Sequence, residues 1–594
     1  MRIKIILFVF FIVWLTLLVR IFYLTVKSNH YYETLSHRNT IKSELITPVR
    51  GEIVDRNKRP LAINKLGFKI SIAPHLRKKS KIKILTKELN NLENLIPDLN
   101  ATKLLKRYVK EDSQYNHDYI TLVDFIEYET VMPIYSQLNL RDYVKVESAQ
   151  MRYYPNNSMA AHTIGYVSKA NKKDIEDKVT KLVGHVGKSG VERYYNHFLQ
   201  GEAGVKKVKV TAQNKQIEVL SYRPAVENRD LTLSLDSELQ KYIQKLLKKK
   251  VGSVVVMDTN GSILALGSYP EYNLNTFVTG ISTKEWKKLI QSVDTPFTNK
   301  IINGLYPPGS TVKTGLGLTF MTEGIMTQFG HSYCTGSMKL GKRNFRCWKR
   351  HGHAKTTLTK AIRESCDDYF YKGSLKLGIE KMSDGFRNFG LGQKTGVDMP
   401  NEFIGTVPSR TWKMNRYSKP WYKGETLNTS IGQGDFLVTP LQMAQFTGLM
   451  ATGKLITPHI AYKLGDEFIK PEIKDILSEK EKEKLPIIQF AMHQVCSHIK
   501  GTATHFLKTK IDIAGKTGTA QVVGISQATK KRLKEHEMEY YRRSHAWLTT
   551  YGPYENPQFI VTVLIEHGGH GGTAAGGIVS KIYNKLDKLG YIKK

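Results

Sequence analysis

Ser310 and Lys313 are the residues of this chain whose types and spacing best fit nucleophilic chemistry. A separation of three places both side chains on the same face of a helix. A serine hydroxyl is a poor nucleophile at neutral pH, and a lysine whose pKa is lowered by burial or by a nearby positive charge can accept its proton. The pair therefore fits nucleophilic catalysis with Ser310 as nucleophile and Lys313 as base.

The setting of Ser310 separates it from two other serines that have a lysine three positions later. Ser310 follows the irregular segment 306–309 and precedes an apolar, glycine-containing stretch that fits a buried helix. A serine at such a helix start lies at the positive end of the helix dipole and faces a cleft. We expect the competing pairs on the surface, one in a lysine run and one on an ordinary amphipathic pattern: Ser80/Lys83 and Ser497/Lys500.

Two further motifs follow along the chain, Ser365-Cys366-Asp367 and Lys-Thr-Gly at 516–518. Each pattern occurs elsewhere in the sequence, so neither is specific by itself. The copy at 516–518 lies between alternating residues and predicts a strand with glycine where another backbone or a ligand approaches closely. The edge of such a strand can pair with an extended peptide, and Lys516 can hold a carboxylate.

These motifs need a scaffold of mixed strands and helices. Val, Ile and Leu alternate or cluster in short runs between turn residues, which is typical of strands. Asp236 is expected to cap the helix that follows it. The predicted elements are a strand-turn-strand unit at 48–57, helices within 76–140, a strand at 231–235, a helix at 237–250, a strand at 251–258, a hairpin turn at 258–261 and a strand at 262–266.

Residues 5–26 form an apolar segment near the N-terminus. As a helix they extend about 33 Å, which matches the apolar core of a bilayer. A cleaved signal peptide is the alternative, but no small-residue cleavage site follows the segment. Arg2 and Lys4 precede it and favour a cytoplasmic N-terminus, which puts the bulk of the chain in the periplasm.

The chain has 594 residues and a formal net charge of +36. A strongly basic protein can bind nucleic acid or an anionic membrane face, or can simply have a solvated lysine surface. Because the bulk of the chain is expected outside the cytoplasm, we expect no nucleic-acid partner. A solvated basic surface remains the default interpretation of the charge.

The three motifs occur in the order Ser-x-x-Lys, Ser-x-Asp, Lys-Thr-Gly, with gaps of 55 and 151 residues. That order, with the flanking sequences, resembles the class B penicillin-binding proteins, and most closely those of the elongation type. The resemblance covers nearly the whole chain. Its motifs are Arg50-Gly51-Glu52-Ile53-Val54-Asp55-Arg56-Asn57, Gly190-Val191-Glu192-Arg193, Tyr306-Pro307-Pro308-Gly309-Ser310, Ile431-Gly432-Gln433-Gly434, Thr439-Pro440 and Lys516-Thr517-Gly518-Thr519-Ala520.

The resemblance implies a mixed α/β (α+β) fold: a serine β-lactamase-like transpeptidase domain with an antiparallel sheet and a helical cluster, an elongated pedestal and one transmembrane helix. The implied domains are a tail and anchor at 1–27, a non-catalytic, dimerisation-type pedestal at 43–230 and a transpeptidase domain at 231–594. In the pedestal, Arg50, Asp55 and Arg56 are interpreted as ion-pairing residues.

The resemblance also implies a peptidoglycan D,D-transpeptidase acting on D-Ala-D-Ala stem peptides, with β-lactams as mimics that acylate the same serine. Ser310 is the implied nucleophile and Lys313 its base. Ser365 relays the proton and Asp367 orients Lys313 and the substrate amide. Asp367 departs from the asparagine usual in the superfamily, and its charge complicates the role of Lys313 as base. The implied groups for the donor carboxylate and the oxyanion are Lys516, Thr517, Gly518, Thr519 and the backbone N–H groups of Ser310 and Thr519.

Three of the four cysteines lie between Lys313 and Asp367, two of them between the first two motifs and the third, Cys366, inside the second motif. The stretch that contains them has few core residues. With one histidine they have the composition of a closed zinc site, although the spacing is longer than in compact zinc fingers. Buried free thiols, or a disulfide between the first two cysteines, are the alternatives, and His331 or His351 can replace the histidine. The candidate ligands are Cys334, Cys347, His353 and Cys366. No cofactor is expected for the chemistry itself.

Three other functions share this chemistry. A β-lactamase does not normally carry a long region before its catalytic domain, a β-lactam sensor usually has several membrane spans, and a division-type transpeptidase differs only in its partners. The chain has neither room nor a motif for a glycosyltransferase. The resemblance therefore implies a polytopic lipid-II polymerase of the SEDS type as partner, within an elongation complex.

Overall fold

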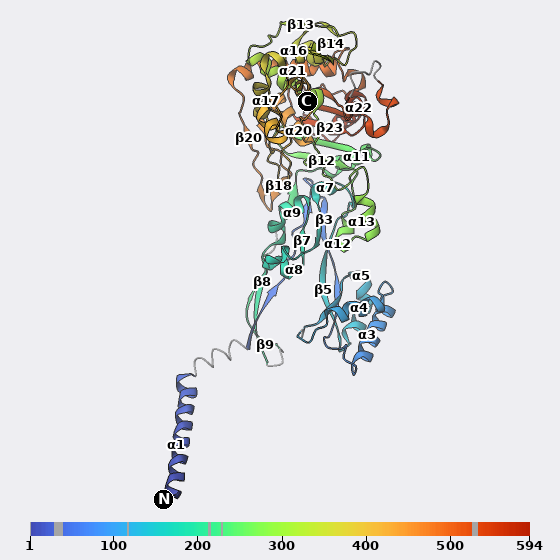
Figure 1. Ribbon diagram of the computed structural model, residues 1–594. Helices are drawn as coiled ribbons and strands as arrows, with labels where there is room; N and C mark the ends of the chain where they lie inside the picture. Colours follow the sequence, from blue (N-terminus) through green and yellow to red (C-terminus); the bar gives the residue numbers. More distant parts are fainter. Residues whose placement is uncertain are drawn as a thin grey trace. The chain divides into compact units, whose positions relative to one another are not determined.

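The computed structural model describes residues 2–28, 40–115, 118–211, 216–226, 230–524 and 533–593 (Figure 1). The chain divides into two compact units that interleave along the sequence. One contains residues 1–51, 170–186 and 197–228, and the other contains residues 52–169, 187–196 and 229–594. The domain boundaries expected from the sequence remain a prediction.

The first unit contains the apolar N-terminal helix. Helix α1 (Arg2–Phe22) continues as one π-helical turn, Tyr23–Lys27. Its mean hydropathy reaches 2.8 and none of the residues in that window is buried, so by length and composition it can cross a membrane. Thr16 and Thr25 donate their hydroxyl groups to carbonyls four residues earlier, which satisfies them within the helix.

The rest of the first unit is built on a three-stranded antiparallel sheet in the order β1–β8–β9. The strands are β1 (Ile41–Ile46), β8 (Gly204–Val210) and β9 (Gln216–Arg223). Val208 and Val210 of β8 are buried, whereas every residue of β9 is exposed.

The second unit begins with a seven-stranded sheet and its helices. The order is β19–β18–β10–β2–β3–β4, with β5 also paired to β3. Leu85, Leu89 and Leu92 of α3 are buried at helical spacing against this sheet, as the sequence predicted for 76–140. The elements are β2 (Ile53–Val54), β3 (Pro60–Ile72), α3 (Ile82–Leu95), α4 (Ala101–Glu111), β4 (Ile120–Glu127), β5 (Val144–Tyr153), β10 (Leu231–Leu233), β18 (Ala461–Leu464) and β19 (Glu467–Phe468).

Asp55 and Arg56 lie in the turn that follows β2, and their interactions are not the ion pairs expected from the sequence. The buried Asp55 carboxylate accepts backbone N–H groups from Asn57 and Ser237. Arg56 lies over the rings of Tyr462 and Tyr591, 5.7 and 5.0 Å from their centroids. Asp55 therefore ties the motif to the helix that starts at Ser237.

A five-stranded antiparallel sheet forms the centre of the C-terminal part of the chain, in the order β12–β11–β23–β22–β21. All residues of β12 and β23 are buried, so both faces of the sheet are covered. Helix α20 packs against β11, β22 and β23, while α22 and α11 pack against β21, β22, β23 and β12 (Figure 1). The elements are α11 (Ser237–Leu247), β11 (Gly252–Asp258), β12 (Ile263–Tyr269), α20 (Pro440–Thr452), β21 (Ala514–Ala520), β22 (His545–Gly552), β23 (Phe559–Ile565) and α22 (Gly571–Lys588).

Several local predictions for this part of the chain are confirmed. Asp236 caps α11, because its carboxylate accepts the N–H groups of Glu238 and Leu239. Asp258 forms the predicted turn between β11 and β12, and its carboxylate accepts the N–H groups of Asn260 and Ser262. The predicted strands at 231–235 and 251–258 form with ends shifted by one or two residues.

A cluster of helices packs beside the edge strand β21. Nine consecutive residues of α14, from Lys313 to Met321, are buried, which confirms the buried helix expected after Ser310. Helix α21 contacts both α14 and β21 and so brings the first and third motifs together. The helices are α14 (Lys313–Thr322), α15 (Leu358–Arg363), α16 (Asp367–Leu377), α17 (Ile379–Asn388), α19 (Lys423–Ser430) and α21 (Glu479–Ser497).

Candidate active site

Ser310 lies in a 3₁₀ turn, Gly309–Val312, that leads directly into α14. Gly309 has φ +58°, a conformation that glycine adopts without strain, and its N–H donates to Gly432 O at 2.9 Å. The Trp547 indole N–H donates to Pro307 O at 3.0 Å. Residues 307–309, the lead-in to Ser310, are therefore held by one hydrogen bond to Gly432 and one from Trp547. These bonds fix the backbone that leads to the half-buried Ser310.

Lys313 is fully buried one turn after Ser310. Its Nζ donates to Asp367 Oδ1 at 2.6 Å, to Ser365 O at 3.1 Å and to Ser365 Oγ at 3.4 Å. A buried ammonium needs such partners to offset the loss of hydration. The first two sequence motifs thus meet at the Lys313 amine, 52 and 54 residues apart in the chain.

Ser365 lies between two lysines. Its Oγ accepts from Lys516 Nζ at 3.1 Å as well as from Lys313. Burial, reinforced by the charge of Lys313, lowers the pKa of Lys516 well below its usual range. Ser365 has φ +55°, an unfavourable conformation for a residue with a side chain, and such strain concentrates at functional sites.

Asp367 begins α16 and has a contact on each side. Its Oδ1 binds Lys313, and its Oδ2 accepts the backbone N–H of Trp348 at 2.9 Å. Its own N–H donates to Cys347 Sγ at 3.4 Å. Burial raises the pKa of the Asp367 carboxyl, although the charge of Lys313 opposes that shift. Asp367 therefore links the lysine to the cysteine-rich segment.

The Lys-Thr-Gly motif lies on β21, the last strand of its sheet, as the sequence predicted. A Cβ atom added to Gly518 would lie 2.9 Å from Pro308 O, so a side chain here would push the lead-in of Ser310 away. A Cβ added to Gly309 would lie 3.2 Å from Thr519 N. The backbone N–H of Thr519 is therefore next to the turn that carries Ser310.

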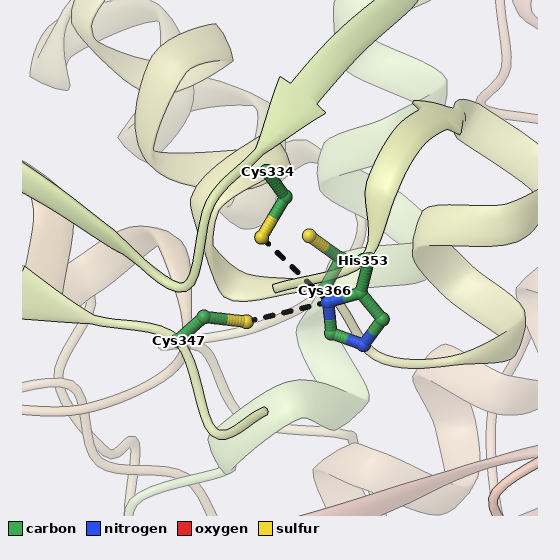
Figure 2. A group of neighbouring side chains, drawn as sticks. All are labelled: Cys334, Cys347, His353 and Cys366. Atoms are coloured by element: carbon green, nitrogen blue, oxygen red, sulfur yellow. Dashed lines mark hydrogen bonds between the residues drawn. The ribbon is translucent and has the colours of Figure 1, made fainter. Parts of the chain in front are cut away.

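The four candidate metal ligands lie together and point toward one another (Figure 2). Their donor atoms are within 4.8 Å of one another, and His353 Nδ1 lies 3.7 Å from Cys334 Sγ and 3.5 Å from Cys347 Sγ. All four residues are buried, and the cysteines are free thiols rather than a disulfide. His331 and His351 are exposed, so His353 is the histidine of the cluster.

The thiols of Cys347 and Cys366 share a hydrogen bond. That bond lowers the pKa of the Cys347 thiol and raises the pKa of the Cys366 thiol. Cysteine binds a metal as the thiolate, so these thiols would lose their protons on metal binding. The donor atoms fit a tetrahedral zinc ion, whose bond lengths of about 2.3 Å to sulfur and 2.0 Å to nitrogen put neighbouring ligands roughly 3.5–3.8 Å apart.

The competing motif copies lie outside this cluster. Ser80 and Lys83 are exposed at the start of α3, and Ser497 donates its hydroxyl to His493 O at the exposed end of α21. Lys394 of the second Lys-Thr-Gly is exposed in a loop. These positions agree with the surface locations expected for the two serine–lysine pairs.

Three residues at the site were not predicted as site residues. Thr502 Oγ1 lies 2.6 Å from Thr517 Oγ1, the exposed Trp348 contacts Asp367 through its backbone, and Gln433 Nε2 donates to Thr519 O at 3.0 Å. Of these three residues, only Gln433 lies in a sequence motif, Ile431–Gly434. The other two are brought in by tertiary packing.

Comparisons with known proteins agree with this geometry. The family model described as penicillin binding protein transpeptidase domain matches residues 252–584, more than half of the chain. The model described as penicillin-binding protein dimerisation domain matches residues 45–233.

A curated relative is the peptidoglycan D,D-transpeptidase MrdA of Haemophilus influenzae, 34% identical over 95% of this chain and 88% of that protein. The penicillin-binding protein PBP2 of Helicobacter pylori, solved in complex with MreC, is 43% identical over 93% of this chain and all of that one, with a TM-score of 0.86. A further match is a chain from a solved structure that describes the coordination of polymerization and crosslinking by a peptidoglycan synthase complex. It is 25% identical over the whole of this chain and 99% of its own length, with a TM-score of 0.72.

The fold and the serine–lysine site define a serine-type acyl transferase with a penicillin-binding transpeptidase domain. The chain belongs to the class B penicillin-binding proteins, and it is a D,D-transpeptidase of the elongation type. The predicted family, fold class and enzyme class are thereby confirmed.

Proposed function

We propose that the chain cross-links peptidoglycan stem peptides through an acyl-enzyme on Ser310. Ser310 Oγ bonds to the carbonyl carbon of the penultimate D-Ala, and the bond from that carbon to the nitrogen of the terminal D-Ala breaks. Lys313 in its neutral amine form takes the hydroxyl proton, which passes through Ser365 to the leaving amine. An amine of a second stem peptide then attacks the ester carbonyl and releases Ser310 Oγ, which takes up the proton that the attacking amine loses.

The observation that carries this proposal is the position of Ser365 Oγ, 3.4 Å from Lys313 Nζ and 3.1 Å from Lys516 Nζ. Two buried amines on one hydroxyl form a path along which a proton can move from the nucleophile to a leaving group. Asp367 fixes the first amine at 2.6 Å, so the path does not depend on flexible side chains.

The edge strand β21 supplies the remaining groups. Lys516, Thr517 and Thr519 bind the carboxylate of the donor, and the hydroxyl of Thr502, 2.6 Å from that of Thr517, belongs to the same subsite. The backbone N–H groups of Ser310 and Thr519 form the oxyanion hole, a contribution of about 3–4 kcal/mol for each donor. Gly518 lets the strand approach the nucleophile closely.

β-Lactams acylate the same serine, because their strained amide carbonyl occupies the place of the D-Ala carbonyl. The amine released when the β-lactam ring opens stays tethered to the acyl group and remains in the site. There it hinders attack on the ester, so the adduct persists. Reactivity of this kind makes the chain a target of these antibiotics.

We also propose a structural zinc ion held by Cys334, Cys347, His353 and Cys366. Zinc would supply no chemistry to the reaction. It would hold the segment that carries Cys347 and Trp348 against Asp367. The buried donor set and its spacing support this assignment.

The domains are assigned as an anchor at 1–27, a pedestal at 43–230 and a transpeptidase domain at 231–594. The apolar helix α1 anchors the chain in the inner membrane, with the bulk of the chain in the periplasm, as Arg2 and Lys4 favour. Because no sequence motif provides glycan polymerisation, the partner is a polytopic lipid-II polymerase of the SEDS type. The relatives in complex with MreC and in a peptidoglycan synthase complex support membership of an elongation complex.

Labelling with a fluorescent penicillin and mass mapping of the acylated peptide tests the nucleophile. The wild-type chain is expected to give one long-lived adduct on Ser310, and Ser310→Ala is expected to give none. Ser80→Ala and Ser497→Ala are matched controls, since each also removes the serine of a Ser-x-x-Lys motif, and both are expected to label normally. Labelling that survives in Ser310→Ala refutes the site, and rapid turnover of the adduct indicates a β-lactamase.

A further inference from the structure

The turn that carries Gln433, residues 431–434, lies directly beside the turn that carries Ser310. The proposed mechanism gives this turn no role in attack or in binding of the donor carboxylate. The turn follows α19, and its backbone is fixed by the N–H of Gln433, which donates to Asn428 O at 3.0 Å. Gly432 and Gly434 have φ values of +68° and +75°, so only glycine fits the turn without strain. A Cβ on Gly432 would lie 2.1 Å from Gly309 O, next to Ser310.

The side chain of Gln433 reaches from this turn to the edge strand. Its Nε2 donates to Thr519 O at 3.0 Å in a half-buried position. β21 is the last strand of its sheet, with β22 on its other side. The Thr519 carbonyl accepts a hydrogen bond from Gln433, which does not belong to β22. This carbonyl therefore points to the open edge of β21, away from β22.

In an antiparallel pair, one residue exchanges both its N–H and its C=O with the residue opposite. The N–H of Thr519 consequently points to the same open edge as its C=O. A donor peptide that pairs with this edge places the scissile carbonyl on the Thr519 N–H. The amide N–H of that same donor residue then needs the Thr519 carbonyl, which Gln433 occupies in the free protein.

We propose that the Gln433 side-chain amide stands in for the N–H of the donor peptide and is displaced when the donor pairs with Thr519. Gln433 is then a specificity-determining residue of the donor subsite. The inference rests on the proposed function, because it needs Ser310 and Thr519 to act on the same carbonyl.

The exchange has a defined consequence for ligands with and without the amide N–H. A ligand that carries the N–H gains one hydrogen bond and loses the Gln433 bond, so its net gain is small. A ligand without the N–H leaves Gln433 in place and the carbonyl satisfied. In a variant whose residue 433 cannot donate, only the ligand with the amide N–H can satisfy the half-buried Thr519 carbonyl. The preference for that ligand over the ligand without the N–H therefore rises.

The test compares benzylpenicillin with penicillanic acid, the same bicyclic ring system without the acylamino group. Second-order acylation rate constants are measured for both ligands on the full-length wild type and on Gln433→Met, which keeps the length of the side chain but cannot donate. The ratio of the two rate constants is expected to rise by about 3- to 10-fold in favour of benzylpenicillin. Gln433→Glu, whose carboxylate also cannot donate, is expected to move the ratio in the same direction and serves if Gln433→Met folds poorly.

Gln291→Met is the matched control, because Gln291 is exposed at the end of a surface helix, and its ratio is expected to equal that of the wild type. An unchanged ratio with both rate constants reduced in parallel overturns the inference, since Gln433 then only braces β21. A fall in the ratio also overturns it. Failure of the proposed function is distinguishable, because it appears as benzylpenicillin labelling that persists in Ser310→Ala whatever the ratio.

Discussion

At the scale of single residues, Asp367 makes the contacts that a neutral side chain cannot reproduce. Its two carboxylate oxygens accept from Lys313 Nζ and from Trp348 N at the same time. An asparagine has one acceptor oxygen, and its NH₂ group can only donate. An asparagine at this position therefore leaves either the amine or the Trp348 N–H without its partner.

Asp367→Asn is expected to slow acylation by benzylpenicillin about tenfold, the effect of losing one charge-assisted hydrogen bond to a buried lysine. The second-order rate constant of acylation measures the effect, and a thermal melt separates it from unfolding. Asp384→Asn, at an exposed carboxylate in α17, is the control and is expected to react at the wild-type rate. A wild-type rate in Asp367→Asn contradicts the positioning role given to the carboxylate.

The residues of the three motifs could be predicted from the sequence because each motif carries its chemistry within a few positions. The position of Ser310 before an apolar stretch fixed its helix, and the alternation around Lys516 fixed its strand. Thr502 and Trp348 could not be predicted, since their contacts depend on how α21 and the cysteine-rich segment pack. Asp55 was interpreted as an ion-pairing residue, but its carboxylate accepts backbone N–H groups instead, two from its own turn and one from Ser237 at the start of a distant helix.

At the scale of elements, the segment from β13 (His331–Cys334) to α16 couples the cysteine cluster to Lys313 through Asp367. Its first part, residues 331–353, includes the β14–β15 hairpin and has many exposed side chains. Apart from two glycines, the buried residues of that part are Cys334, Cys347 and His353. The link to the active site is short: Cys347 Sγ accepts from Asp367 N, and the next residue, Trp348, donates to Asp367 Oδ2. Loss of the cluster should therefore displace Asp367.

Protein purified without chelators is expected to contain about one zinc ion per chain by elemental analysis. Cys347→Ser is expected to lose most of the zinc and to acylate at least tenfold more slowly, because it weakens both the site and the contact to Asp367. Cys496→Ser, at the buried cysteine of α21, is the control and is expected to keep both zinc and rate. Wild-type protein without stoichiometric zinc refutes the metal site.

At the scale of the whole molecule, the apolar helix that can cross a membrane and the residues of the candidate active site lie in different parts of the chain. The apolar residues of α1 are exposed throughout, and the side chains around Ser310 come from residues 306–367, 431–434 and 502–547. A change in α1 is therefore expected to leave acylation intact. Its effect should appear only where the chain works with a membrane partner.

Depletion of the chain from its cells is expected to give round cells, because an elongation-type transpeptidase adds side wall, whereas loss of a division-type enzyme gives filaments. Expression of the wild type is expected to restore the original shape, and Ser310→Ala is expected not to do so.

A version with an unrelated apolar helix of the same length in place of residues 2–27 is the decisive variant. It should remain in the membrane fraction and label with fluorescent penicillin at the wild-type rate, yet restore the shape poorly, because the proposed polymerase partner would contact the span. Full restoration by this variant limits the role of α1 to anchoring, and filaments on depletion contradict the elongation assignment.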